Sequence, residues 1–100
     1  MAHQVLWSPE ALEDLEALTA YIAASNVAAA IATGRAILRK TRAIPLHPEA
    51  GCAVPERNDP CIREVFHGNY RIIYRLPLIA GRVEIMRIWH GARGAPVIQS

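Results

Sequence analysis

The spacing of apolar positions changes partway along the chain. Between residues 10 and 24 they recur every three to four residues, as in an amphipathic α-helix. Ser8 and Pro9 stand just before this stretch and are typical of a helix N-cap and a first helical position. The pattern predicts a helix over residues 9–24, preceded by a short strand over residues 1–7. The apolar stripe of this helix comprises Ala11, Leu15, Leu18 and Ile22.

A second helix is predicted over residues 27–43, because Ser25 and Asn26 interrupt the first helix and can cap another. A basic stripe of arginines lies on one side of it. Since the first helix is acidic, we expect a helical hairpin with surface ion pairs, each worth at most about 1 kcal/mol. The expected buried side of the second helix comprises Val27, Ala30, Ile31, Gly34, Ile37, Leu38 and Thr41, and the stripe comprises Arg35, Arg39 and Arg42.

Apolar and polar residues alternate in the C-terminal part of the chain, which indicates strands. Strands are predicted over residues 62–67, 70–76 and 82–90. Gly68-Asn69 forms a two-residue hairpin turn and residues 77–81 form a second turn. Between the helices and these strands, a proline-punctuated segment over residues 44–60 reads as a long loop.

The central strand of this meander has two distinct faces. One face is expected to pack on the helices, and the other carries Arg71, Ile73 and Arg75. The two arginines are either solvated or paired with Glu64 and Glu84. The last strand does not alternate cleanly: Val83, Ile85 and Trp89 fit one face, and Met86, Ile88 and His90 fit the other. This irregularity indicates either a β-bulge or a strand with both faces partly covered. The face expected against the helices comprises Tyr70, Ile72, Tyr74 and Leu76.

These elements define an α+β fold: an N-terminal strand, a two-helix hairpin, then a three-stranded antiparallel meander. One hundred residues suit a single domain spanning residues 1–100, since a second core would not fit. Cys52 and Cys61 lack metal-ligand spacing and are expected to be free thiols. No signal peptide or membrane-spanning run is recognised, so we expect a cytoplasmic protein. We also expect that the protein holds no metal and no cofactor.

Positive charge is concentrated in the second half of the chain. Residues 51–100 contain seven basic and four acidic residues, whereas residues 1–50 contain four basic and five acidic ones. This asymmetry favours an anionic or acidic partner for the second half. The net charge of only +2 is low for a dedicated nucleic-acid-binding protein.

The order of elements and several short motifs resemble the RelE/ParE toxin superfamily of type II toxin–antitoxin, or plasmid stabilization, modules. The resemblance covers nearly the whole chain. In chain order the motifs are Ser8-Pro9-Glu10-Ala11, Asp14-Leu15, Tyr21-Ile22, Pro48 to Gly51, Ile62-Arg63-Glu64, Tyr70-Arg71-Ile72-Ile73-Tyr74-Arg75, Val83-Glu84-Ile85 and His90-Gly91-Ala92-Arg93.

The resemblance implies a growth-inhibiting toxin that a cognate antitoxin neutralises, as a homodimer or a toxin–antitoxin hetero-oligomer. ParE-like members inhibit DNA gyrase, whereas RelE-like members are ribosome-dependent endoribonucleases that cut mRNA. Residues 94–100 lack the tyrosine that RelE-like enzymes carry beyond the last arginine, which favours the ParE-like side. A third alternative is an inactive or regulatory binding module.

If the chain is a nuclease, the resemblance implies that Arg63, Arg71 and Arg93 contribute cationic groups. Arginine can stabilise a phosphorane but cannot act as a base, because its pKa is above 12. His90 is the plausible group with a pKa near neutrality. In the alternative without catalysis, His90 only closes the last strand, and the arginines contact an antitoxin or are solvated.

Overall fold

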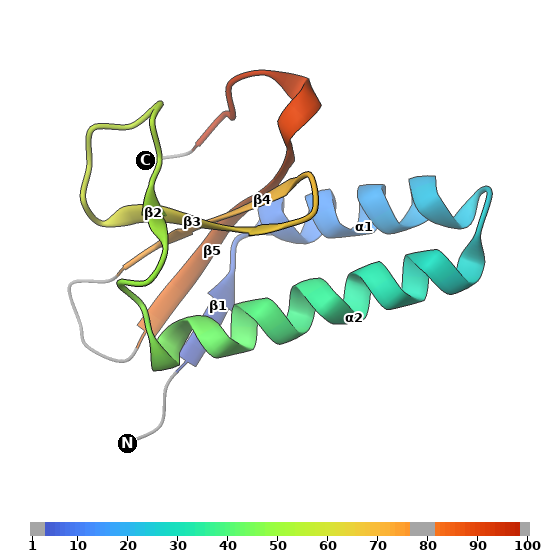
Figure 1. Ribbon diagram of the computed structural model, residues 1–100, viewed down its shortest axis with the longest axis horizontal. Helices are drawn as coiled ribbons and strands as arrows, with labels where there is room; N and C mark the ends of the chain where they lie inside the picture. Colours follow the sequence, from blue (N-terminus) through green and yellow to red (C-terminus); the bar gives the residue numbers. More distant parts are fainter. Residues whose placement is uncertain (1–3, 77–81, 99–100) are drawn as a thin grey trace.

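A computed structural model describes residues 4–76 and 82–98 of the chain (Figure 1). The predicted α+β architecture is confirmed. In chain order the elements are β1 (Gln4–Trp7), α1 (Pro9–Ala23), α2 (Val27–Ala43), the 3₁₀ helix η1 (Ile44–Leu46), β2 (Cys52–Ala53), β3 (Ile62–His67), β4 (Tyr70–Arg75), β5 (Arg82–His90) and the 3₁₀ helix η2 (Gly91–Arg93).

The strands form one sheet in the order β1-β5-β4-β3-β2. β1 runs parallel to β5, and the other neighbours are antiparallel. The expected loop over residues 44–60 is not structureless, because it contains η1 and the short edge strand β2. The predicted turn over residues 77–81 lies outside the described residues.

Both predicted helix caps are present. The Ser8 hydroxyl accepts a hydrogen bond from the Ala11 amide at 3.0 Å, and the Asn26 side chain accepts one from the Ala29 amide at 2.9 Å. The predicted ion pairs between the two helices are absent from the described part of the chain. The helices are therefore held together by packing rather than by opposite charges.

The main hydrophobic core lies between the sheet and the helices. Ala11, Leu18 and Ile37 from the helices pack with residues of β4 and β5, including Ile72 and Tyr74. The helix-facing residues predicted for β4 are therefore correct. The predicted buried side of α2 is wrong at its N-terminal end, where the side chains of Val27 and Ile31 are 63% and 50% exposed. This end of α2 extends past the sheet (Figure 1), so no strand covers it.

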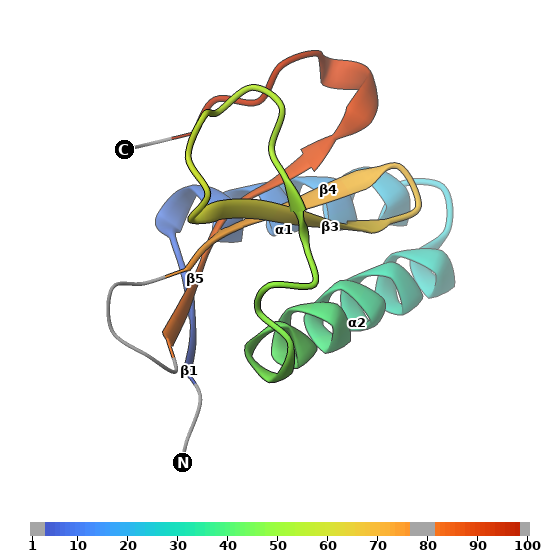
Figure 2. The same ribbon diagram turned by 60° about the vertical axis from the view of Figure 1, so that its left-hand side comes forward.

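A second, smaller core covers the opposite face of the sheet. It consists of Val54, Ile62, Ile73, Met86 and Trp89, with Ile98 packed against it. The segment between β2 and β3 and the segment after η2 lie side by side over this face (Figure 2). The chain therefore covers both faces of its own sheet.

A β-bulge explains the irregular pattern of β5. Ile73 pairs with Arg87 whereas Tyr74 pairs with Ile85, so the register shifts by one residue. The shift places Ile88 on the helix side and Trp89 in the second core, which corrects the faces predicted for these two residues. Both alternatives inferred from the sequence, a bulge and two covered faces, are present.

Candidate functional site

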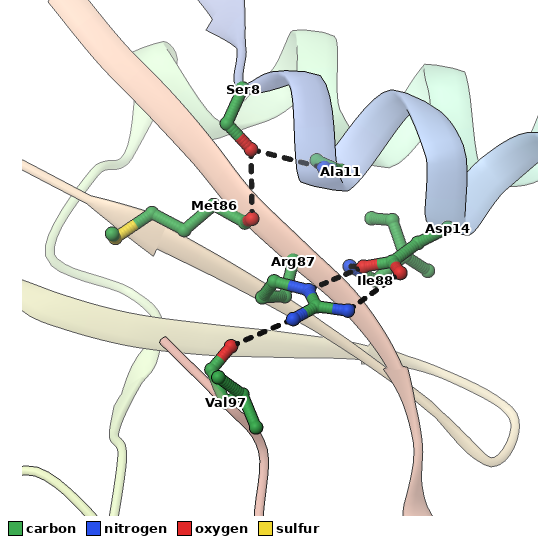
Figure 3. A network of polar contacts seen from close by, with 7 residues as sticks. All are labelled: Ser8, Ala11, Asp14, Met86, Arg87, Ile88 and Val97. Carbon is green, nitrogen blue, oxygen red and sulfur yellow. Dashed lines mark hydrogen bonds and ion pairs between the residues drawn. The ribbon is translucent and has the colours of Figure 1, made fainter. Parts of the chain in front are cut away.

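The edge of β5 is completed by side chains of the α1 N-cap and of α1 rather than by a longer β1. β1 pairs with β5 only as far as Ile85. Beyond this point the Ser8 hydroxyl donates to the Met86 carbonyl at 2.8 Å, and the Ile88 amide donates to the Asp14 carboxylate at 3.0 Å (Figure 3). Two side chains thus take over the hydrogen bonds that a neighbouring strand would make.

Asp14 also fixes the position of Arg87. Two guanidinium nitrogens of Arg87 lie 2.8 Å from the two carboxylate oxygens of Asp14. A third donates to the Val97 carbonyl at 2.9 Å (Figure 3). This bidentate hydrogen bonding with Asp14 raises the pKa of Arg87, so the guanidinium stays charged although its side chain is only 13% exposed. The pair ties α1, β5 and the C-terminal segment together.

The ring of Trp89 contacts two arginines. The guanidinium carbons of Arg87 and Arg93 are 4.8 Å and 4.1 Å from the centre of its ring, within the range of a cation–π contact. The indole nitrogen of Trp89 donates to the Gly94 carbonyl at 3.0 Å. These contacts fold η2 and the following residues back over the second core, so Arg93 is engaged by the protein itself.

Arg71 is paired with two carboxylates on the second face of the sheet. Its Nε lies 2.6 Å from Glu64, and its other two nitrogens lie 3.0 and 2.7 Å from the two oxygens of Glu56. The hydrogen bonds to Glu56 are the main cause of a raised pKa for Arg71, and they lower the pKa of Glu56. One positive and two negative charges leave this cluster with a net charge of −1.

Arg63 lies on the opposite face of the sheet from Arg71. It pairs across the strands with Tyr74, which belongs to the helix-side core. Its guanidinium donates to the carbonyls of Glu49 at 3.2 Å and Gly51 at 3.1 Å. The Tyr74 hydroxyl donates to the Pro48 carbonyl at 2.6 Å, and burial raises its pKa. Arg63 and Tyr74 therefore hold the segment before β2 in place.

His90 closes β5 and caps η2. Its Nδ1 accepts a hydrogen bond from the Ala92 amide at 3.0 Å, so a neutral His90 carries its proton on Nε2. Its ring contacts the Tyr70 ring edge-on, with centroids 5.1 Å apart. A cavity of about 430 Å³ lies beside it, between α1 and the sheet, and Tyr21 and Arg93 also line this cavity. In this arrangement His90 offers a donor rather than a base.

The structure thus brings together only part of the predicted nuclease set. His90 lines one cavity with Arg93 and a second hollow of about 430 Å³ with Arg71, whereas Arg63 lies on the opposite face of the sheet from Arg71. A catalytic role for these four residues stays a prediction. Among the described residues no group of three His, Cys, Asp or Glu side chains could hold a metal ion.

Sequence reasoning missed the roles of Asp14 and Glu56. Asp14 is one of four acids in the first helix, and nothing in their spacing distinguishes it as the partner of Arg87. Glu56 lies in a segment expected to be a loop, so its pairing with Arg71 could not be inferred. The pairing of Arg71 with Glu64 was one of the alternatives drawn from the sequence, and it is observed.

The family comparison agrees with this fold. The family described as the ParE toxin of the type II toxin–antitoxin system, parDE, matches residues 5–94. The chain therefore belongs to the ParE toxin family.

A solved structure has the same fold. It is a chain of the chromosomal ParDE toxin–antitoxin system from P. aeruginosa, with a TM-score of 0.69 and 18% sequence identity over 88% of this chain and 95% of that chain. No curated protein sequence matches the chain. Within residues 4–76 and 82–98, no helix combines the length and apolar composition needed to cross a membrane.

Proposed function

We propose that this ParE-family protein inhibits growth by binding a protein target in the cytoplasm, with DNA gyrase as the favoured target. We propose further that a cognate antitoxin binds and neutralises it. On this proposal the protein acts by binding its target and is not an enzyme. Cells that lose the plasmid or chromosomal region encoding the pair also lose the antitoxin, so the pair stabilises that region.

The separation of Arg63 from the other candidate nuclease residues supports this proposal. RNA cleavage requires cationic groups that converge on one phosphate together with a base. Arg63 and Arg71 are on opposite faces of the sheet and cannot contact the same phosphate. His90 accepts its hydrogen bond through Nδ1, which leaves an N–H on its other nitrogen.

The electrostatics of the Arg71 cluster give further support. Three of the guanidinium hydrogen bonds of Arg71 go to carboxylates, and Glu64 is only 4% exposed. A phosphate would have to displace Glu56 and would still face the buried charge of Glu64. Because like charges repel strongly at such short distances, this cluster disfavours an RNA backbone.

The test is induced expression of the chain without its antitoxin, followed by growth, plasmid supercoiling and mapping of mRNA 5′ ends in the same cultures. We expect growth arrest, intact mRNA and altered supercoiling. The doubly substituted variant Arg71→Gln, His90→Gln serves as a comparison, with circular dichroism to verify its fold.

Codon-positioned mRNA cuts with the wild-type chain, lost in the double variant, would replace the proposal with a ribosome-dependent nuclease. Absence of arrest by a folded, expressed wild-type chain would favour an inactive or regulatory module instead. Purified gyrase, assayed for supercoiling with and without the toxin, then checks the target directly.

A further inference from the structure

The cavity between α1 and the C-terminal end of β5 has no role in the proposed function. Its volume of about 430 Å³ is within the range of pockets that bind small molecules. Ala17, Leu18 and Ile88 form part of its lining, and Tyr21 and Tyr70 add two aromatic rings. Leu18 and Ile88 are buried core residues, whereas Tyr21 is 82% exposed. The cavity therefore has an apolar interior and an aromatic rim.

Arg93 presents a guanidinium to this cavity that no other group of the protein neutralises. Its Cζ lies 4.1 Å from the centre of the Trp89 ring, which holds it by a cation–π contact. Within residues 4–76 and 82–98, no hydrogen bond or ion pair engages the guanidinium. A guanidinium placed over an aromatic ring keeps its N–H groups for bidentate contact with a carboxylate or phosphate.

His90 supplies a second donor to the same cavity. Its Nδ1 accepts from the Ala92 amide at 3.0 Å, so the neutral ring carries its proton on Nε2. In the described part of the chain, no acceptor pairs with this N–H. The edge-on contact with Tyr70 helps to fix the orientation of the ring. Arg93 and His90 thus offer N–H groups to an acceptor that the protein itself does not provide.

The charge around the cavity favours an anion. Of the described residues that line it, only Asp14 is acidic. Both oxygens of Asp14 accept from Arg87, and one also accepts from the Ile88 amide (Figure 3). Arg87 neutralises Asp14, so the charge of Arg93 remains and the three groups together carry a net charge of +1. An anionic group in the cavity would therefore be attracted rather than repelled.

We propose that this cavity binds a small molecule that carries one aromatic ring and one anionic group, either a carboxylate or a phosphate monoester. The anionic group pairs with Arg93 and accepts a hydrogen bond from Nε2 of His90. The ring packs against Leu18, Ile88 and the face of Tyr70. The inference goes beyond the proposed function, because the site needs neither the toxin's target nor its antitoxin.

A nucleic acid strand fits this cavity less well than a small ligand. The neighbouring hollow, which His90 also lines, contains Arg71. Arg71 is already paired with Glu56 and Glu64, and that cluster has a net charge of −1. A strand that continued from the cavity into this hollow would bring its next phosphate toward a negative cluster.

The first experiment titrates small probes into the purified full-length chain and follows backbone amide shifts by NMR. The probes are phenyl phosphate, benzoate, inorganic phosphate and benzyl alcohol. We expect saturable shifts of the Ile88, His90 and Ala92 amides with a Kd of about 1 mM or lower for phenyl phosphate or benzoate. The tighter of these two probes identifies the anionic group. Inorganic phosphate and benzyl alcohol each present half of the ligand and should bind at least about tenfold more weakly.

Two pairs of variants test the two halves of the site. Ala17→Phe fills the apolar part of the cavity from an exposed position of α1, and Ala20→Phe is its control, because Ala20 is exposed on the same helix but does not line the cavity. Arg93→Gln removes the charge, and Arg42→Gln is its control on α2. We expect Ala17→Phe and Arg93→Gln to weaken binding by about tenfold or more, and each control to change it by less than about twofold. Circular dichroism verifies the fold of all four.

Definite outcomes would overturn the proposal. One is the absence of saturable shifts with either aromatic anion up to about 10 mM. Another is wild-type affinity in folded Ala17→Phe and Arg93→Gln. Inorganic phosphate that binds as tightly as phenyl phosphate would indicate a bare anion contact instead of a ligand cavity. A short oligoribonucleotide that binds more tightly than phenyl phosphate, and equally well to Ala17→Phe, would assign this surface to RNA.

Discussion

Gly51 occupies a position where a buried tyrosine leaves no room for a side chain. A Cβ atom there would lie 2.3 Å from the Tyr74 hydroxyl oxygen and 3.0 Å from the Glu64 carbonyl oxygen. Tyr74 is fully buried and donates to the Pro48 carbonyl. The glycine is therefore required by packing, and the backbone before β2 depends on it.

Substitution by alanine should therefore have opposite effects on stability at Gly51 and at Gly34. Gly51→Ala is expected to lower the free energy of unfolding by about 2 kcal/mol, because Tyr74 must move and lose its hydrogen bond. Gly34→Ala is expected to raise it by up to about 1 kcal/mol, since Gly34 lies inside α2 and its Cβ would make an ordinary contact with Thr19. Urea unfolding of both variants checks the difference in sign.

The pairing of Glu56 with Arg71 predicts a pH dependence of stability. The pKa of Glu56 is lowered in the folded protein, so its contribution is present above its ordinary pKa of 4.5 and is lost as the pH falls through the lowered value. Because Glu56 is partly exposed, we expect the contribution to be at most about 1 kcal/mol. Urea unfolding between pH 3 and 7 should show a shallower acid decline for Glu56→Gln than for wild type, and identical profiles would contradict the linkage.

The alternation of β3 and β4 was enough to suggest that Arg71 pairs with Glu64, because strand residues of one face lie close across a hairpin. It could not indicate that Glu56 joins them. That contact depends on how the segment between β2 and β3 folds back, which no local periodicity encodes. The same hairpin register places Arg63 opposite Tyr74 and so on the other face from Arg71. Only the carbonyl anchors of Arg63 depend on how the loop folds.

At the scale of elements, the half of β5 beyond Ile85 is a strand edge, because β1 no longer pairs with it. Strand edges expose unpaired amides and carbonyls that invite association with other chains. Ser8 and Asp14 satisfy two of these groups. The N-terminal end of α1 therefore also protects the unpaired edge of β5.

Removal of the Asp14 carboxylate should destabilise this edge strongly. Asp14→Ala leaves Arg87 and the Ile88 amide without their partner, and we expect a loss of about 3 kcal/mol. Hydrogen exchange of the Ile88 amide should accelerate. Glu13→Ala, at an exposed position of the same helix, should change stability by less than about 0.5 kcal/mol and leave that amide protected.

Caps and periodicity predicted the helices within a residue or two, because Ser8 and Asn26 define their starts. The short strand β2 and the exposure of two residues of α2 escaped prediction for physical reasons. β2 has only two residues, too few to alternate. Val27 and Ile31 have helical core spacing, yet the sheet does not extend far enough to bury them; their placement depends on the relative lengths of helix and sheet.

At the scale of the whole molecule, the sheet separates two hydrophobic cores. We expect that the packing of one core can be disrupted while the other stays folded. Ile98 packs on the second core, and its carbonyl accepts from Arg57 at 3.0 Å. Ile98→Asp should lower stability by about 2 kcal/mol by placing a carboxylate against this core. In a Trp7→Phe background the emission of Trp89 should shift to longer wavelength while the helical circular dichroism is retained.

Val97→Asp is the matched control, because Val97 is 57% exposed and contributes its backbone carbonyl rather than its side chain. It should leave the Trp89 emission unchanged. Simultaneous loss of helical signal and emission shift in Ile98→Asp would mean that the two cores unfold as one unit.

The position of β5 has a consequence for the order of events during synthesis. Among the described strands β5 is translated last, yet it lies between β1 and β4 and is the only strand that contacts β1. Until β5 leaves the ribosome, β1 therefore has no strand to pair with, and the two helices have no complete sheet to pack on. Translation itself sets the earliest moment at which the protein can reach its native form.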